Sequence, residues 1–486
     1  MKSRKILIQL TFVLAALLLA PSCAVNPVTG EKQLMFFSEA QEIQMGKEYD
    51  PQVIAAFGLY EDEELSNFIT EKGKEMGKIS HRPNLEYHFR VLDSPVINAF
   101  AVPGGYVYFT RGILSQFNNE AELAGVLGHE IGHITARHTV SQQSKQQLGQ
   151  LLLAGGMIAS KEFRQFADYA MQGMQLLFLK YSRDAERQSD RLGVEYSTRI
   201  GYNSHEMANF FKVLHNMRME SESGGVPTFM STHPDPADRL ERVHELTKKW
   251  QDSIPKDNYL VRRNDYLRMI DGIVYGEDPR QGYVEENTFY HPEMRFKYPV
   301  PSGWRLQNMP TQVQMAPSDG RALMIFSMAR QDVLNDAAQT TLKELNLNVL
   351  DMKRADVNGL NAVVAVSEQT SENQQGQQQT IKVLSYFIDY GRIYVFHGVT
   401  SSGEFNSYYR LFENTMVNFD ELNDPSKLNV EPARVRIKEV HRNTSVAEVF
   451  RYYGVPQERM DELALLNNKE LNEQVSAGEL IKILSE

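Results

Sequence analysis

The sequence has only one cysteine, Cys23, among its 486 residues. A single cysteine excludes a disulfide framework and a metal site built on a CxxC pair. Basic residues are also in deficit, because 51 Lys and Arg face 62 Asp and Glu and leave a net charge of −11. This balance, without any long basic run, removes the usual electrostatic basis for binding nucleic acid.

Long apolar runs are missing beyond the N-terminus. No later segment offers the about 18 consecutive apolar residues of a membrane-spanning helix, so we expect the rest of the chain to be water-soluble. The overall composition, with 42% apolar and 23% charged residues, is ordinary for globular protein. A chain of 486 residues with this composition can bury a core in each of about three domains.

The N-terminus has the pattern of an export signal. Three basic residues among the first five precede an apolar run from Ile6 to Ala20. Small residues then precede Cys23, and this arrangement resembles the lipobox of bacterial lipoproteins. The resemblance implies cleavage before Cys23 and a lipid anchor on the new amino terminus. The alternative is an ordinary signal peptide with a chance cysteine.

The residue after the cysteine indicates the membrane in which such a lipoprotein is anchored. Residue 24 is Ala, not the Asp that marks retention in the inner membrane of enterobacteria. The resemblance therefore implies a lipid anchor in the outer membrane, with the protein facing the periplasm of the bacterial cell envelope.

The pattern of the chain changes several times after the signal. The first long part is predicted to be mostly helical, interrupted by a strand at Tyr106–Thr110 that follows a Pro-Gly-Gly turn. A later part mixes short β-rich runs with helical stretches near 336–346 and 405–419, which predicts an α+β domain of unassigned role. The predicted units are a signal peptide (1–22), a helical domain (23–250), a connector (251–285), the α+β domain (286–420), a linker (421–433) and a terminal module (434–486).

The strongest chemical signal is an HExxH motif, His129-Glu130-Ile131-Gly132-His133. On a helix, imidazoles four residues apart share one face and can both ligate one zinc ion at about 2.0–2.1 Å. Glu130 then points toward the metal-bound water and can take its proton. Asn119 and Glu122 resemble a capping box before a run of helically spaced apolar residues, so we expect this helix. The alternative is a surface helix with two incidental histidines.

A second helical segment can complete the metal site. A catalytic zinc needs three protein ligands and an open position for water. Glu186 and Asp190 are four residues apart within YSRDAERQSD and share a helix face. Glu186 is the predicted third ligand, and Asp190 can accept a hydrogen bond from a ligand histidine and fix its tautomer. Alone, these two acids would indicate only a solvated helix face.

These segments together resemble zinc metallopeptidases of the HtpX and BepA type, peptidase family M forty-eight, which also holds the CAAX prenyl proteases. The likeness covers about half of the chain and implies a mostly helical gluzincin-type fold with a small sheet. The tetratricopeptide repeats expected after the peptidase domain of BepA are absent from this sequence. The segments that carry the likeness are 26–46, Asn98–Leu114 (NAFAVPGGYVYFTRGIL), HExxH, SRxxExxxD at 182–190 and STHP at 231–234 with Arg239.

The resemblance also implies roles for residues outside the metal motif. Substrate would lie extended along an edge strand containing Tyr106 and Tyr108, with Asn98 nearby. His233 would lie near the zinc, either as an occluding fourth ligand or as a hydrogen-bond donor in the transition state. Arg239 would stabilise developing charge or the loop that holds His233. The alternative for His233 is a turn residue before proline.

Two further segments receive structural interpretations. His138 follows His133 by five residues and falls on another helix face, so we interpret it as structural or exposed. Leu148–Ile158 is an apolar run too short to span a bilayer, and we interpret it as core or as a lid, with contact to a membrane surface as the alternative.

The terminal module has a loose resemblance to a LysM-like βααβ fold. The similarity rests on the VAEVF segment at Val446–Phe450, the Tyr-Gly-Val of 453–455 and GELIKI at Gly478–Ile483. It implies contact with peptidoglycan through residues 434–486. The alternative is a generic packing module, since a fold alone does not identify a ligand.

Two functional hypotheses from different classes follow. The first is an endopeptidase with one Zn²⁺ per chain, which hydrolyses unfolded, misfolded or misassembled envelope proteins with Glu130 as general base. The second is a non-catalytic envelope scaffold or chaperone in which the metal site is structural. An intact Glu130 favours the enzyme, because a structural site needs no base beside its ligand.

Overall fold

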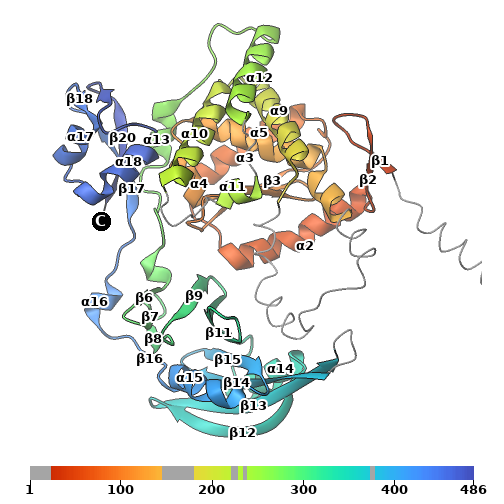
Figure 1. Cartoon of the computed structure of the whole chain (residues 1–486), viewed down its shortest axis with the longest axis vertical. Coiled ribbons are helices and arrows are strands. Elements are labelled where there is room, and N and C mark those ends of the chain that lie inside the picture. Colours follow the sequence, from red (N-terminus) through yellow and green to blue (C-terminus); the bar gives the residue numbers. More distant parts are fainter. Residues whose placement is uncertain (1–22, 145–179, 221–227, 234–237, 373–377, 486) are drawn as a thin grey trace, which may run out of the picture.

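The computed structural model describes residues 23–144, 180–220, 228–233, 238–372 and 378–485. The predicted signal peptide and the apolar run Leu148–Ile158 lie outside these residues. Three parts are visible in Figure 1: a helical body (23–275), a sheet body (279–421) and a terminal module (434–485). The terminal module lies against the helical body, and the sheet body lies below both. The predicted α+β multidomain class is confirmed.

The helical body surrounds one small sheet and is preceded by a short hairpin. Its strands are β1 (Cys23–Val25), β2 (Lys32–Leu34), β3 (His88–Leu92), β4 (Ala99–Val102) and β5 (Tyr106–Thr110). Its helices are α2 (Glu39–Phe57), α3 (Glu63–Ile79), α4 (Arg111–Gln116), α5 (Glu120–Thr135), α9 (Arg183–Arg199), α10 (His205–Glu220), α11 (Thr228–Thr232), α12 (Arg239–Ser253) and α13 (Arg263–Met269).

The small sheet has the strand order β3-β5-β4. β5 is parallel to β3 and antiparallel to β4, so both of its edges are hydrogen-bonded. Val107 and Phe109 enter the main core of the helical body, whereas Tyr106 and Tyr108 enter a smaller cluster against α2. This alternation follows from the two-residue period of a strand. The strand is confirmed, but its prediction as an edge strand is wrong.

The helix that carries HExxH is buried along its whole length. Asn119 caps α5 by accepting the backbone N–H of Glu122 at 2.9 Å, as the sequence predicts. α5 packs on α9 through glycine, because a Cβ on Gly128 would lie 2.9 Å from the carbonyl oxygen of Gly193. A Cβ on Gly193 would lie 3.0 Å from the backbone nitrogen of His129. The two helices therefore meet at backbone distance, which leaves little freedom in their relative position.

The sheet body contains two sheets. The four-stranded sheet has the order β16-β8-β7-β6, and the seven-stranded sheet has the order β12-β13-β14-β15-β11-β10-β9. The strands are β6 (Tyr283–Glu285), β7 (Thr288–His291), β8 (Phe296–Pro299), β9 (Trp304–Met309), β10 (Gln312–Pro317), β11 (Ala322–Met328), β12 (Asn348–Val357), β13 (Leu360–Glu372), β14 (Gln378–Asp389), β15 (Ile393–Ser401) and β16 (Asp420–Glu421). The helices are η1 (Pro279–Gln281), α14 (Leu334–Glu344) and α15 (Phe405–Val417), close to the predicted helical stretches.

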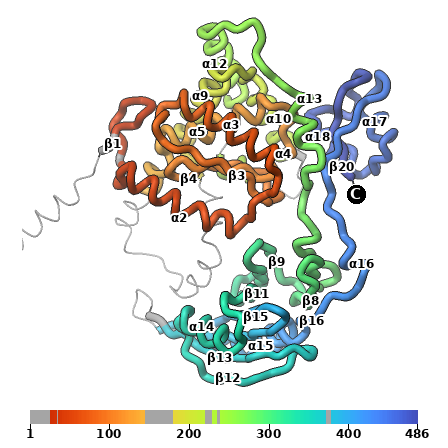
Figure 2. The backbone as a smooth tube through the Cα atoms, turned by 180° about the vertical axis from the view of Figure 1, so that it is seen from behind, coloured from red at the N-terminus to blue at the C-terminus, as the bar shows by residue number. Residues whose placement is uncertain are grey.

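The terminal module places two helices between the two strands of an antiparallel pair, β17 (Arg434–Glu439) and β20 (Leu480–Ser485). The remaining elements from the linker onward are α16 (Pro425–Leu428), β18 (Thr444–Ser445), α17 (Val446–Tyr452), η2 (Gln457–Arg459), α18 (Met460–Leu466) and β19 (Gln474–Val475). Seen from behind in Figure 2, the blue strand β20 lies next to the green helix α13. Val435 and Leu480 share the main core of the helical body, so the two parts are packed as one.

The predicted connector at 251–285 differs from the structure in its middle part. α13 follows α12, and Tyr266, Leu267 and Ile270 are buried in the main core of the helical body. The Tyr266 hydroxyl donates to the carbonyl oxygen of Leu114 at 2.6 Å. A polar and glycine-containing composition therefore concealed a short amphipathic helix that belongs to the helical body.

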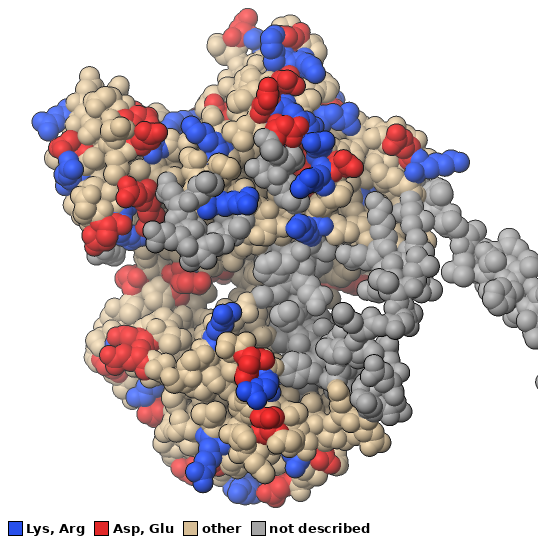
Figure 3. All heavy atoms as spheres, viewed as in Figure 1, with Lys and Arg blue, Asp and Glu red and all other residues tan. Residues whose placement is uncertain are grey.

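None of the helices among the described residues has the length and apolar character required to cross a membrane. On the face drawn in Figure 3, Lys and Arg side chains lie among Asp and Glu side chains over both large bodies. The described residues of that face therefore do not gather charge of one sign.

Candidate metal centre

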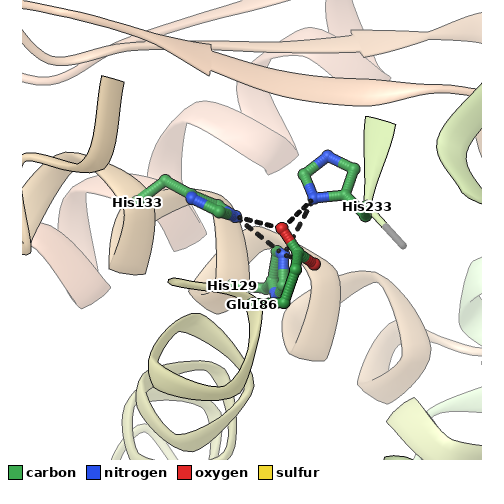
Figure 4. Close-up of side chains that lie close together, drawn as sticks. All are labelled: His129, His133, Glu186 and His233. Atoms are coloured by element: carbon green, nitrogen blue, oxygen red, sulfur yellow. Dashed lines mark hydrogen bonds and ion pairs between the residues drawn. The ribbon is translucent and has the colours of Figure 1, made fainter. Parts of the chain in front are cut away.

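Three helices bring four candidate ligands to one point. α5 presents His129 and His133 one turn apart, and α9 presents Glu186 one turn after its cap residue Ser182. His233 follows directly after α11 and reaches the same point from the opposite side (Figure 4). All four side chains are buried, and their ligand atoms lie within 4.8 Å of one another.

The separations between these atoms suit a tetrahedral zinc site. The Nε2 atoms of His129 and His133 are 3.0 Å apart, and they lie 3.5 and 3.4 Å from the carboxylate oxygens of Glu186. Nδ1 of His233 lies 3.2 Å from Nε2 of His129 and 3.1 Å from Oε1 of Glu186. Zinc bonds of about 2.0–2.1 Å at tetrahedral angles place ligand atoms about 3.3–3.4 Å apart. The donor set therefore fits one zinc ion.

Unpaired polar atoms in the cluster also point to a cation. Both carboxylate oxygens of Glu130 and Oε2 of Glu186 are buried and have no hydrogen-bond partner among the described residues. Glu130 lies fully buried beside the cluster, with Oε1 3.7 Å from Nε2 of His233. Buried carboxylates without partners are costly unless a positive charge compensates them. A Zn²⁺ ion held by these donors would supply that charge.

A group of residues behind the ligands holds His129 and Glu186. The carboxylate of Asp190 can only accept, so Nδ1 of His129 donates to it at 2.9 Å and leaves Nε2 free for the metal. Nη2 of Arg239 donates to Asp190 at 2.7 Å and lies 3.7 Å from Glu186. The Arg239 guanidinium also covers the Phe211 ring at 3.7 Å from its centroid. The predicted partnership of Asp190 with a ligand histidine is present.

The electrostatics of His133 and Glu186 favour the protonation states that zinc requires. Burial lowers the pKa of His133 well below its usual range, which keeps the imidazole neutral. Burial would raise the pKa of Glu186, but the charges and hydrogen bonds of its histidine neighbours outweigh it and hold that pKa well below normal. Burial raises the pKa of Glu130, which makes this carboxylate a stronger base.

Two residues beside His133 were missed as part of the site by sequence reasoning. Nδ1 of His138 lies 3.1 Å from Nδ1 of His133, and its Nε2 faces Oε1 of Gln188 at 3.0 Å. The contacts made by His138 with His133 and Gln188 orient His133 so that its Nε2 points to the cluster. The ring of Tyr181 stacks on His133 with centroids 3.9 Å apart. His138 is structural, as predicted, but it is buried and acts through a ligand.

His233 is held by the short helix before it. The ring of Phe229 stacks on His233 with centroids 4.5 Å apart. The N–H of Phe229 donates to the carbonyl oxygen of Ile97 at 3.0 Å, and Thr232 donates to the side chain of Asn98 at 3.4 Å. α11 therefore lies against the chain entering β4. The proline after His233 and the glycine pair at 224–225 are outside the described residues.

The residues predicted to bind substrate are only partly brought to the site. Asn98 is buried next to α11 and close to the cluster. Tyr106 stacks on His88 with centroids 4.4 Å apart, and the hydroxyl of Tyr108 donates to Asp50 on α2 at 2.9 Å. Both tyrosines point to the face of the sheet opposite α5, because Val107 and Phe109 take the face that α5 covers. The two tyrosines therefore lie on the sheet face away from the cluster, and their contact with substrate stays a prediction; β4 is the edge strand on the side of the cluster.

Comparison with known proteins agrees with this geometry. The model of Peptidase family M48 matches residues 64–247, which include the four ligands. The beta-barrel assembly-enhancing protease of Yersinia pestis is 26% identical over 344 residues, covering 68% of this chain and 65% of that protein. The protein of the same name from Escherichia coli (strain K12) is 28% identical over 257 residues, covering 50% of this chain and 52% of that protein.

A eukaryotic protein is also similar to this chain. The mitochondrial metalloendopeptidase OMA1 of Saccharomyces cerevisiae is 29% identical over 192 residues, covering 38% of this chain and 52% of that protein. The chain thus spans between about half and just under two thirds of the length of these curated relatives.

Proposed function

Because residues 64–247 match the model of Peptidase family M48, we propose that this protein is a zinc-dependent endopeptidase that cleaves misfolded or misassembled proteins of the bacterial cell envelope. The observation that carries the proposal is the buried set of His129, His133 and Glu186 beside Glu130, whose carboxylate oxygens have no hydrogen-bond partner among the described residues. The substrate class follows from the predicted export signal and from relatives named beta-barrel assembly-enhancing protease.

The chemistry assigns each side chain a task. A bound zinc ion lowers the pKa of a coordinated water to about 7 and polarises the peptide carbonyl. Glu130 accepts the proton of the attacking water and later passes it to the leaving amine. Asp190 keeps His129 in the tautomer that leaves Nε2 unprotonated, and His138 does the same for His133. Arg239 neutralises Asp190 and Glu186 from behind, and therefore positions the ligands without touching the substrate.

A non-catalytic scaffold is the competing function, and Glu130 argues against it. A zinc site with a structural role needs ligands but no base. Glu130 is fully buried beside the cluster, where an unpaired carboxylate lowers stability. A role in proton transfer explains why the protein has the buried carboxylate of Glu130 at this position.

Cleavage of an unfolded protein with and without a chelator tests the proposed function. We expect the purified protein to degrade casein, a chelator to abolish the cleavage, and added zinc to restore it. A zinc-loaded protein that leaves casein and other unfolded chains intact would support the scaffold.

His233 provides a way to restrain such an enzyme, and we infer that it closes the resting site. Nδ1 of His233 lies among the other three donors and would occupy the position that a catalytic zinc keeps for water. α11 at the same time lies beside the β4 edge, where an extended substrate would pair. A substrate or partner that displaces α11 would remove both obstacles together.

Replacing His233 by alanine should increase the basal cleavage of an unfolded substrate, or self-cleavage, by several-fold and keep the zinc content. The exposed His215 on α10 supplies the control, since H215A should change neither property. Zinc content and initial rate on the same samples give the result. Loss of activity at full zinc content would instead assign His233 to transition-state hydrogen bonding. No change in either measurement would make His233 a turn residue.

The location of the protein is inferred from Cys23. We propose that Cys23 is lipidated and anchors the chain in the outer membrane, with the peptidase facing the periplasm. C23S should then be extracted without detergent, and persistent membrane association of that variant would contradict a lipid anchor.

Peptidoglycan contact through residues 434–486 is a further proposal, and pull-down of the full chain with isolated peptidoglycan tests it.

A further inference from the structure

The carbonyl groups at the end of α4 are satisfied by side chains from distant parts of the chain. α4 ends at Gln116 and α5 begins at Glu120, so these carbonyls form the joint that leads into the metal helix. The last carbonyls of a helix have no partner within it and must find one elsewhere. The hydroxyl of Tyr266 donates to Leu114 at 2.6 Å, and Nζ of Lys482 donates to Ser115, Gln116 and Phe117 at 2.9, 3.2 and 2.8 Å.

Lys482 belongs to the terminal module, where it is fixed from two sides. It is fully buried on β20, and its Nζ also donates to the carbonyl oxygen of Leu466 at 3.0 Å. The side chain of Asn467 holds both backbone polar groups of Lys482, at 2.8 and 2.9 Å. The ammonium group is therefore delivered to the α4–α5 joint by a rigid neighbour and not by a free chain end.

A carboxylate in the metal helix compensates the buried charge. Glu122 lies in the first turn of α5 and accepts the N–H of Asn118 at 2.8 Å. Burial lowers the pKa of Lys482 and raises that of Glu122 to about 8, and the charge of each group opposes the shift of the other. A buried ammonium is tolerated only with such compensation and with its protons hydrogen-bonded. Glu122 at the start of α5 meets the first condition, and the carbonyl oxygens of the α4–α5 joint and of Leu466 meet the second.

The module stays docked through contacts other than Lys482. The N–H of Gly272 donates to the carbonyl oxygen of Val435 at 2.8 Å, and the N–H of Val435 donates to Ile273 at 2.9 Å. Nη1 of Arg263 donates to the carbonyl oxygen of Leu480 at 2.8 Å. A substitution at Lys482 therefore removes the cap on the α4–α5 joint without removing the whole interface.

We propose that Lys482 is a positioning residue of the metal centre, which holds the α4–α5 joint from the terminal module and thereby sets where α5 presents His129, Glu130 and His133. The continuity of α5 gives this effect its range. Because one helix from Glu120 to Thr135 carries both its first turn and the ligand histidines, a shift at its start displaces His129 and His133 and strains the close contact of Gly128 with Gly193. The catalytic part of this inference rests on the proposed function.

The test compares K482M and K482Q with K438M in the full chain. Methionine keeps an unbranched side chain, one atom shorter, and removes every donor, whereas glutamine keeps two donors without the charge. Lys438 lies on β17 of the same module, and its ammonium lies over the Tyr453 ring, 6.0 Å from the centroid, away from the joint. Hydrogen exchange of residues 120–135, zinc release to a chromogenic chelator, and the kcat and KM for casein are measured on each protein.

We expect K482M to exchange its α5 amides and release zinc on the order of 10-fold faster, with lower kcat and unchanged KM. K482Q should fall between K482M and the unaltered chain, and K438M should match the unaltered chain. Exchange in α3 serves as the internal reference, because a purely structural role would accelerate α3 and α5 alike. If K482M does not fold, K482Q decides on the same readouts.

Unaltered α5 exchange and zinc release in both Lys482 variants would overturn the proposal, and so would equal acceleration in α3 and α5. Failure of the proposed function would look different, because the unaltered chain itself would then not cleave casein, whether or not it holds zinc. Hydrogen exchange of α5 still decides the positioning role in that case.

Discussion

Replacing Glu130 by glutamine should leave one zinc ion per chain and reduce peptide hydrolysis by at least about 100-fold, and by up to about 10⁴-fold. The amide has the shape of the carboxylate but cannot accept a proton from water. None of the atoms of Glu130 belongs to the set of four donors, so the metal should remain. The buried carboxylate also has no hydrogen-bond partner to lose, so the fold should tolerate the exchange.

The control for that variant comes from the same helix. Glu120 accepts the hydroxyl of Tyr202 at 2.7 Å at the start of α5, and E120Q keeps an acceptor there. Zinc content by elemental analysis and casein cleavage should both be normal in E120Q. Wild-type turnover in E130Q at full zinc content would show that another group activates the water, and would remove Glu130 from the mechanism.

Replacing Glu186 by alanine should abolish both zinc binding and activity. The variant removes the only carboxylate of the four donors, and with it the negative charge that balances Zn²⁺. The loss of affinity should exceed the roughly 10–100-fold that a supporting residue contributes. Asp190 provides that comparison, because D190A leaves all four donors in place and should fall within this range.

A second glutamate on α9 supplies the matched control. Glu195 is buried on the same helix and pairs with Arg199 at 3.3 Å, away from the cluster. E195A should lose some stability and hold one zinc ion. Titration of E186A, D190A and E195A with zinc and a competing chelator measures the order of their zinc affinities. Equal affinity in E186A and the unaltered chain would exclude Glu186 as a ligand.

The parts of the site that sequence predicts are those set by helical periodicity. His129 and His133 follow from a spacing of four, and Asn119 marks the helix start as the structure shows it. Glu186 and Asp190 follow from the same period on a second helix. These spacings lie within single helices, so the sequence predicts them without knowledge of the tertiary structure.

The parts that sequence does not predict depend on neighbours far along the chain. A β-rich run at 106–110 indicates a strand, but strand order decides whether it is central or at the edge. The sequence shows that the side chains of this strand alternate between the two faces of the sheet. It does not show which face packs against α2 and which packs against α5. The buried α13 and the role of His138 were hidden for the same reason. Each of these features can be assigned only when the segments that pack against it in the fold are known.

The contact between Lys482 and Ser115 joins residues 367 positions apart. At synthesis rates of about 5–20 residues per second, the α4–α5 joint therefore waits about 20–70 s for its cap. A nascent or stalled chain that has already made every zinc ligand still lacks the lysine that fixes the ligand helix. Under the positioning role that we propose for Lys482, the metal helix is therefore fixed only after the sheet body and most of the terminal module have been synthesised.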